Sequence, residues 1–284
     1  MEGPPRKFFR NAISEFSDLV CSMNMTTLDD ELLVHREGDI GVITFNRPQA
    51  RNALTFEMYE SLASVCHSVI DKTLDIRSLI ITGAGDKAFA AGTDISRFRS
   101  FSTADDALNY ERTMDRVLGM LESVPVPTVA AIRGACTGGG AAIAACCDLR
   151  IASDDIKYGF PIARTLGNCL SNTNLSRLVE LLGAARTRDI LLTSRLITMH
   201  EALSINLVNE VVADPFARAR ELCNQMHEHA PLTIAASKEG LRRLRASRDD
   251  VPGDDLIVQC YTSEDFREGI DAFLAKRKPD WRGC

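Results

Sequence analysis

Short apolar runs alternate with amphipathic segments along the first half of the chain. Residues 32–36 (LLVHR) and 41–45 (GVITF) are two short segments rich in apolar residues, and the Glu-Gly-Asp tripeptide between them favours a turn, so they predict a β-hairpin. Thr55 then precedes a helical pattern, with Glu57 in its first turn, which predicts a capped helix. The apolar stripe of this helix consists of Met58, Leu62, Val65 and Val69.

A second round of strand and helix follows. Residues 78–82 predict a short buried strand, and residues 83–95 predict the loop that leaves it, because glycines there permit a turn. Thr103 and Asp106 open a second predicted helix. Its apolar stripe consists of Met114, Val117, Leu118 and Leu121. Residues 149–153 predict another strand, and this order of elements predicts an α/β fold with helices crossing over a sheet.

The stretch from Pro125 to Asp148 has the clearest local pattern in the chain, a strand followed by a glycine turn and a helix. An apolar strand is predicted from Val126 to Ile132, and three glycines at 138–140 directly precede the small-residue helix AAIAACC. Main-chain N–H groups in such a turn are open to a ligand oxygen, and the helix dipole stabilises negative charge there. The pattern therefore fits an anion-binding turn and, equally well, close packing of a helix on a sheet.

Two nucleotide-binding glycine patterns are absent from the sequence. The pattern G-x-G-x-x-G, started at Gly138, needs a glycine at the position of Ile143. No G-x-x-x-x-G-K-[ST] phosphate loop occurs anywhere in the chain. The glycine cluster therefore does not indicate a dinucleotide site.

The second half of the chain has a helical pattern from Asn174 onward. One apolar face consists of Leu175, Leu178, Val179 and Leu182. Gly183 is predicted to stop this helix, and residues 186–193 to form the next one. Asn206 suits a left-handed helix end, and further helices are predicted from Phe216.

Composition and charge argue against two classes of partner, nucleic acid and membrane. With 284 residues, of which 45% are hydrophobic and 25% charged, the chain is long enough to bury a full core. Its net charge of −6 argues against nucleic acid as a partner, because a phosphate backbone needs a basic face. No apolar run approaches the roughly 18 residues that span a membrane, so no membrane partner is expected.

Cysteine usage points to a reducing compartment. The nine cysteines are odd in number and lack both C-x-x-C and zinc-type spacing, so we expect free thiols, a cytoplasmic protein and no metal site. Residues 1–24 predict a flexible N-terminal extension, for which an accessory segment and a true start at Met25 are both open interpretations. A membrane-surface helix is the sharper alternative, but it has little positive charge and its acidic residues also disfavour a transit peptide.

The stretch PTVAAIRGACTGGGAAIAACCDLRIAS resembles the signature of the enoyl-CoA hydratase/isomerase, or crotonase, family. Four more segments resemble family motifs in the same order, which makes the resemblance far more specific than one glycine turn. These segments are ITFNRPQARNAL, AFAAGTDI, LTSRLITMHEALSINLVNEVV and SEDFREGIDAFLAKRKPDW. The resemblance covers residues 32–281.

The resemblance implies a fold and an assembly. It implies an α/β spiral of β-β-α units followed by a C-terminal helical oligomerisation region. We accordingly expect an extension over residues 1–24, a core domain over 25–213 and a helical region over 214–284. The expected assembly is a homotrimer or a hexamer built from two trimers.

The resemblance also implies an acyl-CoA thioester site. Two main-chain N–H donors that stabilise an enolate oxygen carry over to Thr93 and Gly139. Coenzyme A enters as part of the substrate, with no separate cofactor. Positions that line this ligand carry over to Arg51, Ala53, Leu54, Ala91, Asp94, Ile95, Gly138, Ala142, Pro161 and Ile162. Arg51 and the run 276–278 are candidate phosphate partners, although a solvated charge run explains 276–278 equally well.

Three positions depart from the family pattern. The two glutamates with which the family's hydratases activate water correspond to Ala142 and Ile162, and the glutamate of a related group of isomerases corresponds to about Ser171. The polar residues predicted near the acyl end are Thr137, Arg164, Asn168, Cys169, Ser171, Asn172 and Asn174. Loop hydrogen bonding and helix capping explain most of them, whereas Arg164 could bind a substrate carboxylate bidentately.

Three functions therefore remain open from the sequence. The first is an enoyl-CoA hydratase or isomerase in the broad family sense, acting through a thioester enolate. The second is a decarboxylase-like or other non-hydratase lyase on a CoA ester, which needs no glutamate base. The third is a non-catalytic acyl-CoA-binding protein.

Overall fold

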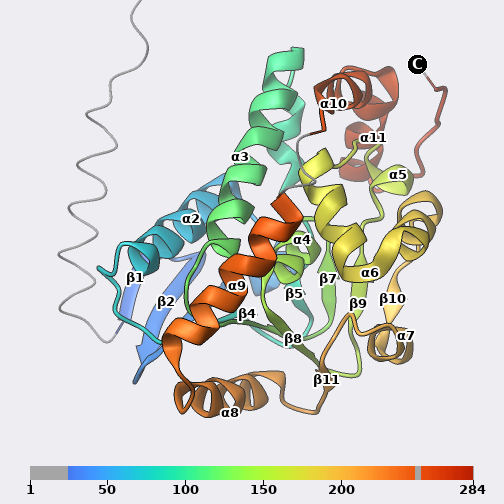
Figure 1. Ribbon diagram of the computed structural model, residues 1–284. Coiled ribbons are helices and arrows are strands. Elements are labelled where there is room, and N and C mark those ends of the chain that lie inside the picture. The colour runs from blue at the N-terminus through green and yellow to red at the C-terminus, as the bar shows by residue number, and fades with distance from the viewer. Residues whose placement is uncertain (1–24, 247–250, 284) are drawn as a thin grey trace, which may run out of the picture.

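A computed structural model describes residues 25–246 and 251–283 and shows two sheets surrounded by helices (Figure 1). The larger sheet contains seven strands, in the spatial order β1 (Met25–Asp29), β2 (Leu32–Glu37), β3 (Ile40–Phe45), β4 (Ser78–Gly83), β6 (Thr128–Ile132), β8 (Leu149–Ala152) and β11 (Glu210–Val211). The first three strands are antiparallel, and the pairs from β3 to β11 are parallel. The predicted hairpin is thereby confirmed as β2 and β3.

Apolar runs supply the centre of this sheet. Ile43 pairs with Ile81, and Ile81 pairs with Ala130 on the next strand. All three side chains are buried, as expected for parallel strands that are covered on both faces. The strands predicted near residues 78–82, 126–132 and 149–153 are therefore confirmed as β4, β6 and β8.

The smaller sheet has four short strands, in the order β10 (Ile197–Thr198), β9 (Lys157–Gly159), β7 (Ala135–Thr137) and β5 (Ala88–Ala90). The prediction of an unbroken loop over residues 83–95 is wrong, because β5 lies within it. A three-residue strand is too short to show an alternating pattern, and β5 is held by parallel pairing with β7, which lies far away in the sequence.

The chain repeats one unit three times. A strand of the larger sheet, a strand of the smaller sheet and a helix follow one another in β4-β5-α3, β6-β7-α4 and β8-β9-α5. The three helices are α3 (Ala104–Glu122), α4 (Gly139–Cys146) and α5 (Ile162–Thr165). The predicted α/β class and the spiral of β-β-α units are confirmed.

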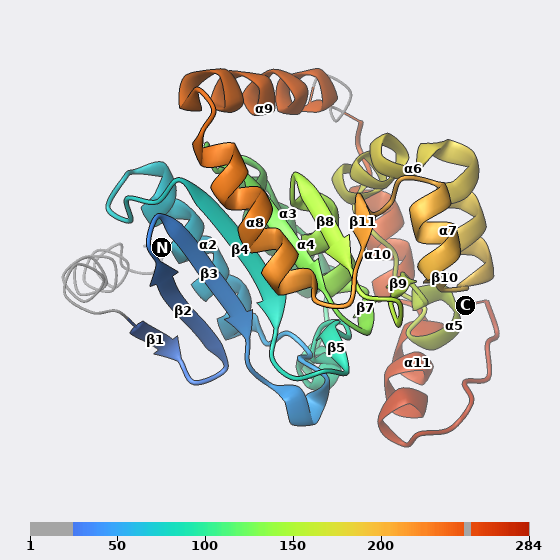
Figure 2. The same cartoon turned by 90° about the horizontal axis from the view of Figure 1, so that it is seen from below.

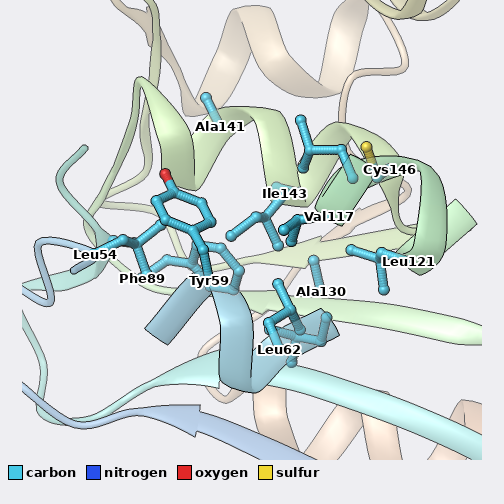
Figure 3. Close-up of a cluster of buried hydrophobic side chains, with 14 of the residues drawn as sticks. Leu54, Tyr59, Leu62, Phe89, Val117, Leu121, Ala130, Ala141, Ile143 and Cys146 are labelled. Atoms are coloured by element: carbon cyan, nitrogen blue, oxygen red, sulfur yellow. The ribbon is translucent and has the colours of Figure 1, made fainter. Parts of the chain in front are cut away.

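The predicted helix starts are also confirmed. Helix α2 (Phe56–Ile70) begins after Thr55, whose hydroxyl accepts from the N–H of Met58 at 3.2 Å. Helix α3 begins after Thr103, which caps the N–H of Asp106 at the same distance. Side chains of α2, α3 and α4 meet over the sheet in the main core, which includes Leu62, Leu121 and Ile143 (Figure 3).

The helices after β9 wrap the other sides of the molecule. They are α6 (Asn172–Thr193), α7 (Met199–Ser204), α8 (Pro215–His227), α9 (Pro231–Ala246), α10 (Asp254–Tyr261) and α11 (Glu264–Leu274). Two 3₁₀ helices, η1 (Pro48–Ala50) and η2 (Ile95–Ser100), lie earlier in the chain. Gly183 interrupts α6 with φ 74° and ψ 154°, as predicted, and Asn206 has the expected left-handed conformation at φ 58°.

The apolar face predicted on the first half of α6 is only partly buried. Leu178 is buried at 1% exposure, whereas Val179 is 43% exposed. The helix begins at Asn172 rather than Asn174, because Ser171 caps it. The helical period was therefore right, but a single chain does not cover the whole stripe.

Helix α8 packs against β4, β6 and β8 on the face of the larger sheet opposite α2 and α3 (Figure 2). Its Ala219 and Cys223 belong to a second core with Val42 and Ile151. The division between residues 213 and 214 stays a prediction, and the helix directly after it shares a core with the sheet. In contrast, α9 stands away from the sheet (Figure 2).

Some predictions concern residues outside the described part. The extension over residues 1–24 lies outside it. Within the described residues, no helix is long and apolar enough to cross a membrane. The seven cysteines for which the structure gives a side chain are free thiols.

Candidate active site

A cavity of about 130 Å³ is lined by the glycine turns, α3 and the C-terminal helices. One wall is apolar and consists of Ile95, Phe98, Met114, Leu118, Leu166, Leu170 and Phe273. The lining also includes the two turns predicted to hold a thioester oxygen, at residues 91–93 and 137–139. The cavity therefore combines an apolar pocket with main-chain donors, as small-molecule sites usually do.

The two turns touch each other. A side-chain carbon on Gly139 would lie 3.0 Å from the Thr93 hydroxyl, and one on Gly138 would lie 3.4 Å from the α-carbon of Gly92. Gly139 is the first residue of α4, so its N–H has no acceptor within the helix. The structure thus brings the two residues of the predicted oxyanion hole to one place.

The turn at Thr93 is held by its neighbours in a parallel bridge to Leu54. The N–H of Leu54 donates to the carbonyl of Gly92, and the N–H of Asp94 donates to the carbonyl of Leu54, both at 2.8 Å. Main-chain groups alternate in direction along an extended segment, so the N–H of Thr93 faces away from Leu54. That leaves it available to a ligand.

The hydroxyl groups of two buried tyrosines meet that of the half-buried Thr93 beside these donors. The Thr93 hydroxyl lies 2.9 Å from that of Tyr59 and 3.2 Å from that of Tyr110. Burial raises the pKa of both tyrosines, which therefore remain neutral. Figure 3 shows Tyr59 among the core side chains, with its oxygen directed toward the start of α4. The side chain of Thr93 thus supports the turn whose N–H was the predicted donor.

The predicted ligand residues divide into two groups. Those in the cavity wall, together with Thr93 and Gly139, are Ala91, Ile95, Gly138, Ala142, Pro161 and Ile162. Arg51, Ala53, Leu54 and Asp94 lie outside the wall and hold the turns in place. The carbonyl of Arg51, for example, accepts from the N–H of Ala91 at 3.0 Å, and Asp94 pairs with Arg47 at 3.1 Å. Contacts of the second group with coenzyme A remain predictions.

The polar residues predicted at the acyl end also divide into those that line the cavity and those that do not. Thr137, Asn168 and Asn174 line the cavity, whereas Cys169, Ser171 and Asn172 do not. The Ser171 hydroxyl accepts from the N–H of Asn174 at 3.2 Å and donates to Asp115 at 2.8 Å, so it caps α6. Arg164 is exposed and absent from the wall. The role of Arg164 as the partner of a substrate carboxylate therefore stays a prediction, and α5 leaves its side chain exposed and outside the cavity wall.

The basic run 276–278 has fewer groups free to bind a phosphate than its charge suggests. Arg277 forms a bidentate pair with Glu268, at 2.5 and 2.7 Å. The guanidinium of Arg277 is thus already paired with a carboxylate. The role of Lys276 and Lys278 as phosphate partners stays a prediction. No group of three or more histidine, cysteine, aspartate or glutamate side chains in the described residues is arranged to hold a metal ion.

One carboxyl group lines the cavity. Glu111, from α3, is 4% exposed, and its Oε1 accepts from the hydroxyl of Tyr261 at 2.5 Å. The Nδ2 of Asn168 donates in turn to the Tyr261 hydroxyl at 3.2 Å. Burial raises the pKa of the Glu111 carboxyl to about 7; hydrogen bonds from Tyr261 and the Ser171 N–H oppose this rise, and the charge of Asp115 adds to it.

Comparison with known proteins identifies the family. The family model described as Enoyl-CoA hydratase/isomerase matches residues 35–284. The chain belongs to the enoyl-CoA hydratase/isomerase family. The short-chain-enoyl-CoA hydratase of Clostridium acetobutylicum is 32% identical over 254 residues, covering 88% of this chain and 96% of that protein. The 2,3-dehydroadipyl-CoA hydratase of Escherichia coli is 30% identical, covering 89% and 99%.

Solved structures agree with this family. An enoyl-CoA hydratase/carnithine racemase from Magnetospirillum magneticum has a TM-score of 0.73 at 32% identity, covering 92% of this chain and 98% of that one. A methylmalonyl-CoA decarboxylase in complex with 2-nitronate-propionyl-CoA has a TM-score of 0.79 at 27% identity, covering 89% and 99%. Membership in the enoyl-CoA hydratase/isomerase family therefore confirms the resemblance found in the sequence.

Sequence reasoning missed four polar residues of this enoyl-CoA hydratase/isomerase site, namely Tyr59, Tyr110, Glu111 and Tyr261. One signal was present for Glu111. It stands three positions before Met114 and seven before Leu118, on the apolar stripe of its helix. A carboxyl on a buried helical face is unusual and marks a position to inspect.

Proposed function

We propose that the protein binds an acyl-CoA thioester and processes it through an enolate. The carbonyl oxygen of the thioester accepts from the N–H groups of Thr93 and Gly139. The contact between the two turns at the cavity carries this proposal. One donor of this kind contributes about 3 kcal/mol of transition-state stabilisation.

Efficient hydration is not the reaction that the cavity favours. The resemblance assigns the water-activating glutamates to Ala142 and Ile162, and both of these hydrocarbon side chains line the cavity. They provide no group that accepts or donates a proton. The cavity therefore supports formation of a thioester enolate better than the activation of water between two carboxylates.

A decarboxylase-like lyase is the second candidate, since the similar methylmalonyl-CoA decarboxylase structure has the same fold. A substrate carboxylate needs a cation or several donors. The cavity wall formed by described residues contains no lysine, arginine or histidine, and Glu111 would repel a second carboxylate. These observations favour uncharged acyl groups over malonyl-type ones.

The test is a panel of CoA esters with saturated, unsaturated and malonyl-type acyl groups. Binding is followed by calorimetry and products by mass spectrometry. We expect binding of the uncharged esters, conversion of at least one of them and no binding of NAD. Tight NAD binding without affinity for acetyl-CoA contradicts the proposal, whereas ester binding without any conversion indicates a binding protein.

A matched pair of variants tests the donor at Gly139. A side-chain carbon at this position would lie 1.9 Å from the Tyr59 hydroxyl, so both variants also carry Tyr59→Phe. Gly139→Ala retains the N–H and Gly139→Pro removes it, while proline is tolerated at the first position of a helix. We expect the proline variant to be about 100-fold slower than the alanine variant. Equal rates contradict the assignment.

A further inference from the structure

The only carboxyl group among the described residues of the cavity wall is unexplained by the oxyanion hole. Glu111 faces a wall that is otherwise hydrocarbon, hydroxyl, amide and main chain. Burying a carboxyl group is costly unless hydrogen bonds or a function compensate. Its position on α3 differs from Ala142 on α4 and Ile162 on α5, where the resemblance predicts glutamates.

We propose that Glu111 is the acid/base group of this site, taking a proton from the acyl chain and returning it. The inference rests on the proposed function, because it requires a thioester oxygen held by Thr93 and Gly139. It assigns the proton transfer to α3, a helix on which no catalytic residue was predicted. It also selects the class of substrate.

The position of Glu111 relative to the donors supports this assignment. Its neighbour Tyr110 reaches the Thr93 hydroxyl at 3.2 Å, so this turn of α3 lies directly against the donor turn. The charge of Glu111 also acts on Tyr59, whose hydroxyl is 2.9 Å from that of Thr93. Thr93, Gly139 and Glu111 line one cavity, and the proposal places the acyl chain of a thioester held at Thr93 along the wall that contains Glu111.

Helix α10 and the connection between α5 and α6 together hold the carboxyl. Tyr261 from α10 donates to it at 2.5 Å, and Asn168, before α6, donates to Tyr261 at 3.2 Å. The N–H of Ser171 contributes a main-chain hydrogen bond. Such support fixes the orientation of an acid/base group.

Asn168 supplies an independent sign of a ligand. It lines the cavity, and its buried Oδ1 has no hydrogen-bond partner within the part of the chain that the structure describes. Buried acceptors are normally satisfied. A hydroxyl group or water that enters with the substrate would satisfy this one.

The electrostatic surroundings permit both protonation states near neutral pH. The groups that act on Glu111, or on which it acts, are Tyr59, Tyr110, Asp115, Cys169 and Tyr261. Asp115 is itself 3.6 Å from Arg177, which compensates part of its charge. Because burial raises the pKa of Glu111 to about 7, the carboxyl can accept and release a proton there.

A single acid/base group is sufficient to move a double bond. In a 3-enoyl-CoA, the C2–H bond breaks, its electron pair enters the thioester dienolate, and the proton passes to Glu111. The same proton then bonds to C4, the dienolate electrons form the C2–C3 double bond, and Glu111 is again a carboxylate. Atoms and charge balance without water or a cofactor. The inferred substrates are therefore uncharged, β,γ-unsaturated acyl-CoA esters.

The experiment uses two probes with the full chain. Butyryl-CoA in D₂O reports exchange at C2 by mass spectrometry, and 3-hexenoyl-CoA reports isomerisation through the absorbance of the conjugated product. We expect Glu111→Gln to bind both esters like the wild type and to lose both reactions by about 10²- to 10⁴-fold. Glu111→Asp should recover part of the rate.

Asp115→Asn is the matched control, because it removes a carboxylate one turn further along the same helix, outside the cavity wall. We expect this variant to remain active and the midpoint of its pH profile to move lower, since the charge of Asp115 raises the pKa of Glu111. If Glu111 had only a structural role, the midpoint of the pH profile of activity would not move in this variant. If Glu111→Gln does not fold, this shift decides the proposal, and an unchanged or flat profile overturns it.

The possible failures can be distinguished. Wild-type exchange that persists in folded Glu111→Gln overturns the role of Glu111 but leaves the proposed function intact. Ester binding without exchange in the wild type overturns acid/base chemistry at this site. Absence of ester binding in the wild type overturns the proposed function and this inference together.

Discussion

The hydroxyl of Tyr59 lies 2.9 Å from the hydroxyl of Thr93, directly beneath the start of α4. This contact occupies the space into which a side chain at position 139 would extend. Glycine at 139 is therefore required by packing against Tyr59, in addition to any need for an open N–H. The two requirements can be separated by mutation.

Gly139→Ala should lower both thermal stability and turnover, because the added carbon would lie 1.9 Å from the Tyr59 oxygen. Overpacking of this kind costs about 1–3 kcal/mol. Adding Tyr59→Phe should restore most of the stability, since the ring carbon that remains is 3.2 Å away. Calorimetric melting of the single and double variants measures this rescue, and equal destabilisation of both contradicts the packing explanation.

Glu111→Gln should stabilise the fold at alkaline pH. The folded pKa of about 7 exceeds the ordinary value of 4.5, so between these values the folded state holds a proton that the unfolded state has released. The stability contributed by Glu111 therefore falls as pH rises through this window, by about 3 kcal/mol in total. Urea unfolding at pH 4 and pH 8 should therefore show that the wild type loses more stability than the variant over this range, because the other titrating groups are common to both.

Asp106 lies on the same helix, but its effect on stability changes with pH in the opposite direction, which the variant Asp106→Asn tests. Hydrogen bonds from Ser102 and Thr103 lower the pKa of Asp106, so its carboxylate stabilises the fold above its ordinary pKa. That stabilisation is lost as pH falls through the lowered value. The variant should therefore be less stable than the wild type at pH 7, and a gain in stability would contradict this role.

The chain should form a trimer or a pair of trimers through its C-terminal helices. Leu241 and Leu244 of α9 are 63% and 67% exposed in the single chain, which is unusual for neighbouring leucines. Changing both to glutamate should shift light scattering toward a monomer. Ile70→Glu, on the exposed end of α2, is the control and should leave the assembly intact. A monomeric wild type at micromolar concentration contradicts the prediction.

Hydration of crotonyl-CoA should be weak in the wild type. Ala142→Glu with Ile162→Glu places two carboxyl groups in the cavity wall and should raise hydration by 10²-fold or more. The matched double glutamine variant has nearly the same volume without proton transfer and should not gain activity. Wild-type rates equal to those of the double glutamate variant would show that other residues already activate water.

The sequence predicted those parts of the fold that local chemistry decides. Thr55 and Thr103 could be identified as helix caps, and Gly183 as a break, because each acts on main-chain groups within a few positions. The three-residue strand β5 was missed because its partner β7 is distant in the sequence. Short strands owe their existence to that pairing rather than to a period of their own.

The candidate site was predicted to a similar degree. Thr93 and Gly139 were predicted as donors from the family resemblance, and the structure brings these two residues together. Glu111 was missed because its environment is created by Tyr261, which only the tertiary fold brings near. Arg164 was chosen for its residue type, and residue type alone does not say that the short helix α5 leaves this side chain exposed and outside the cavity wall.

Glu111 and Tyr261 are separated by 150 positions, and Phe273, which completes the cavity wall, follows later still. Contacts between such distant positions form late, because closing a long loop costs entropy before the contact compensates it. A growing chain thus acquires both glycine turns well before the hydroxyl that holds the carboxyl. During synthesis, the residues proposed to polarise a thioester therefore emerge before the tyrosine that holds the proposed acid/base group.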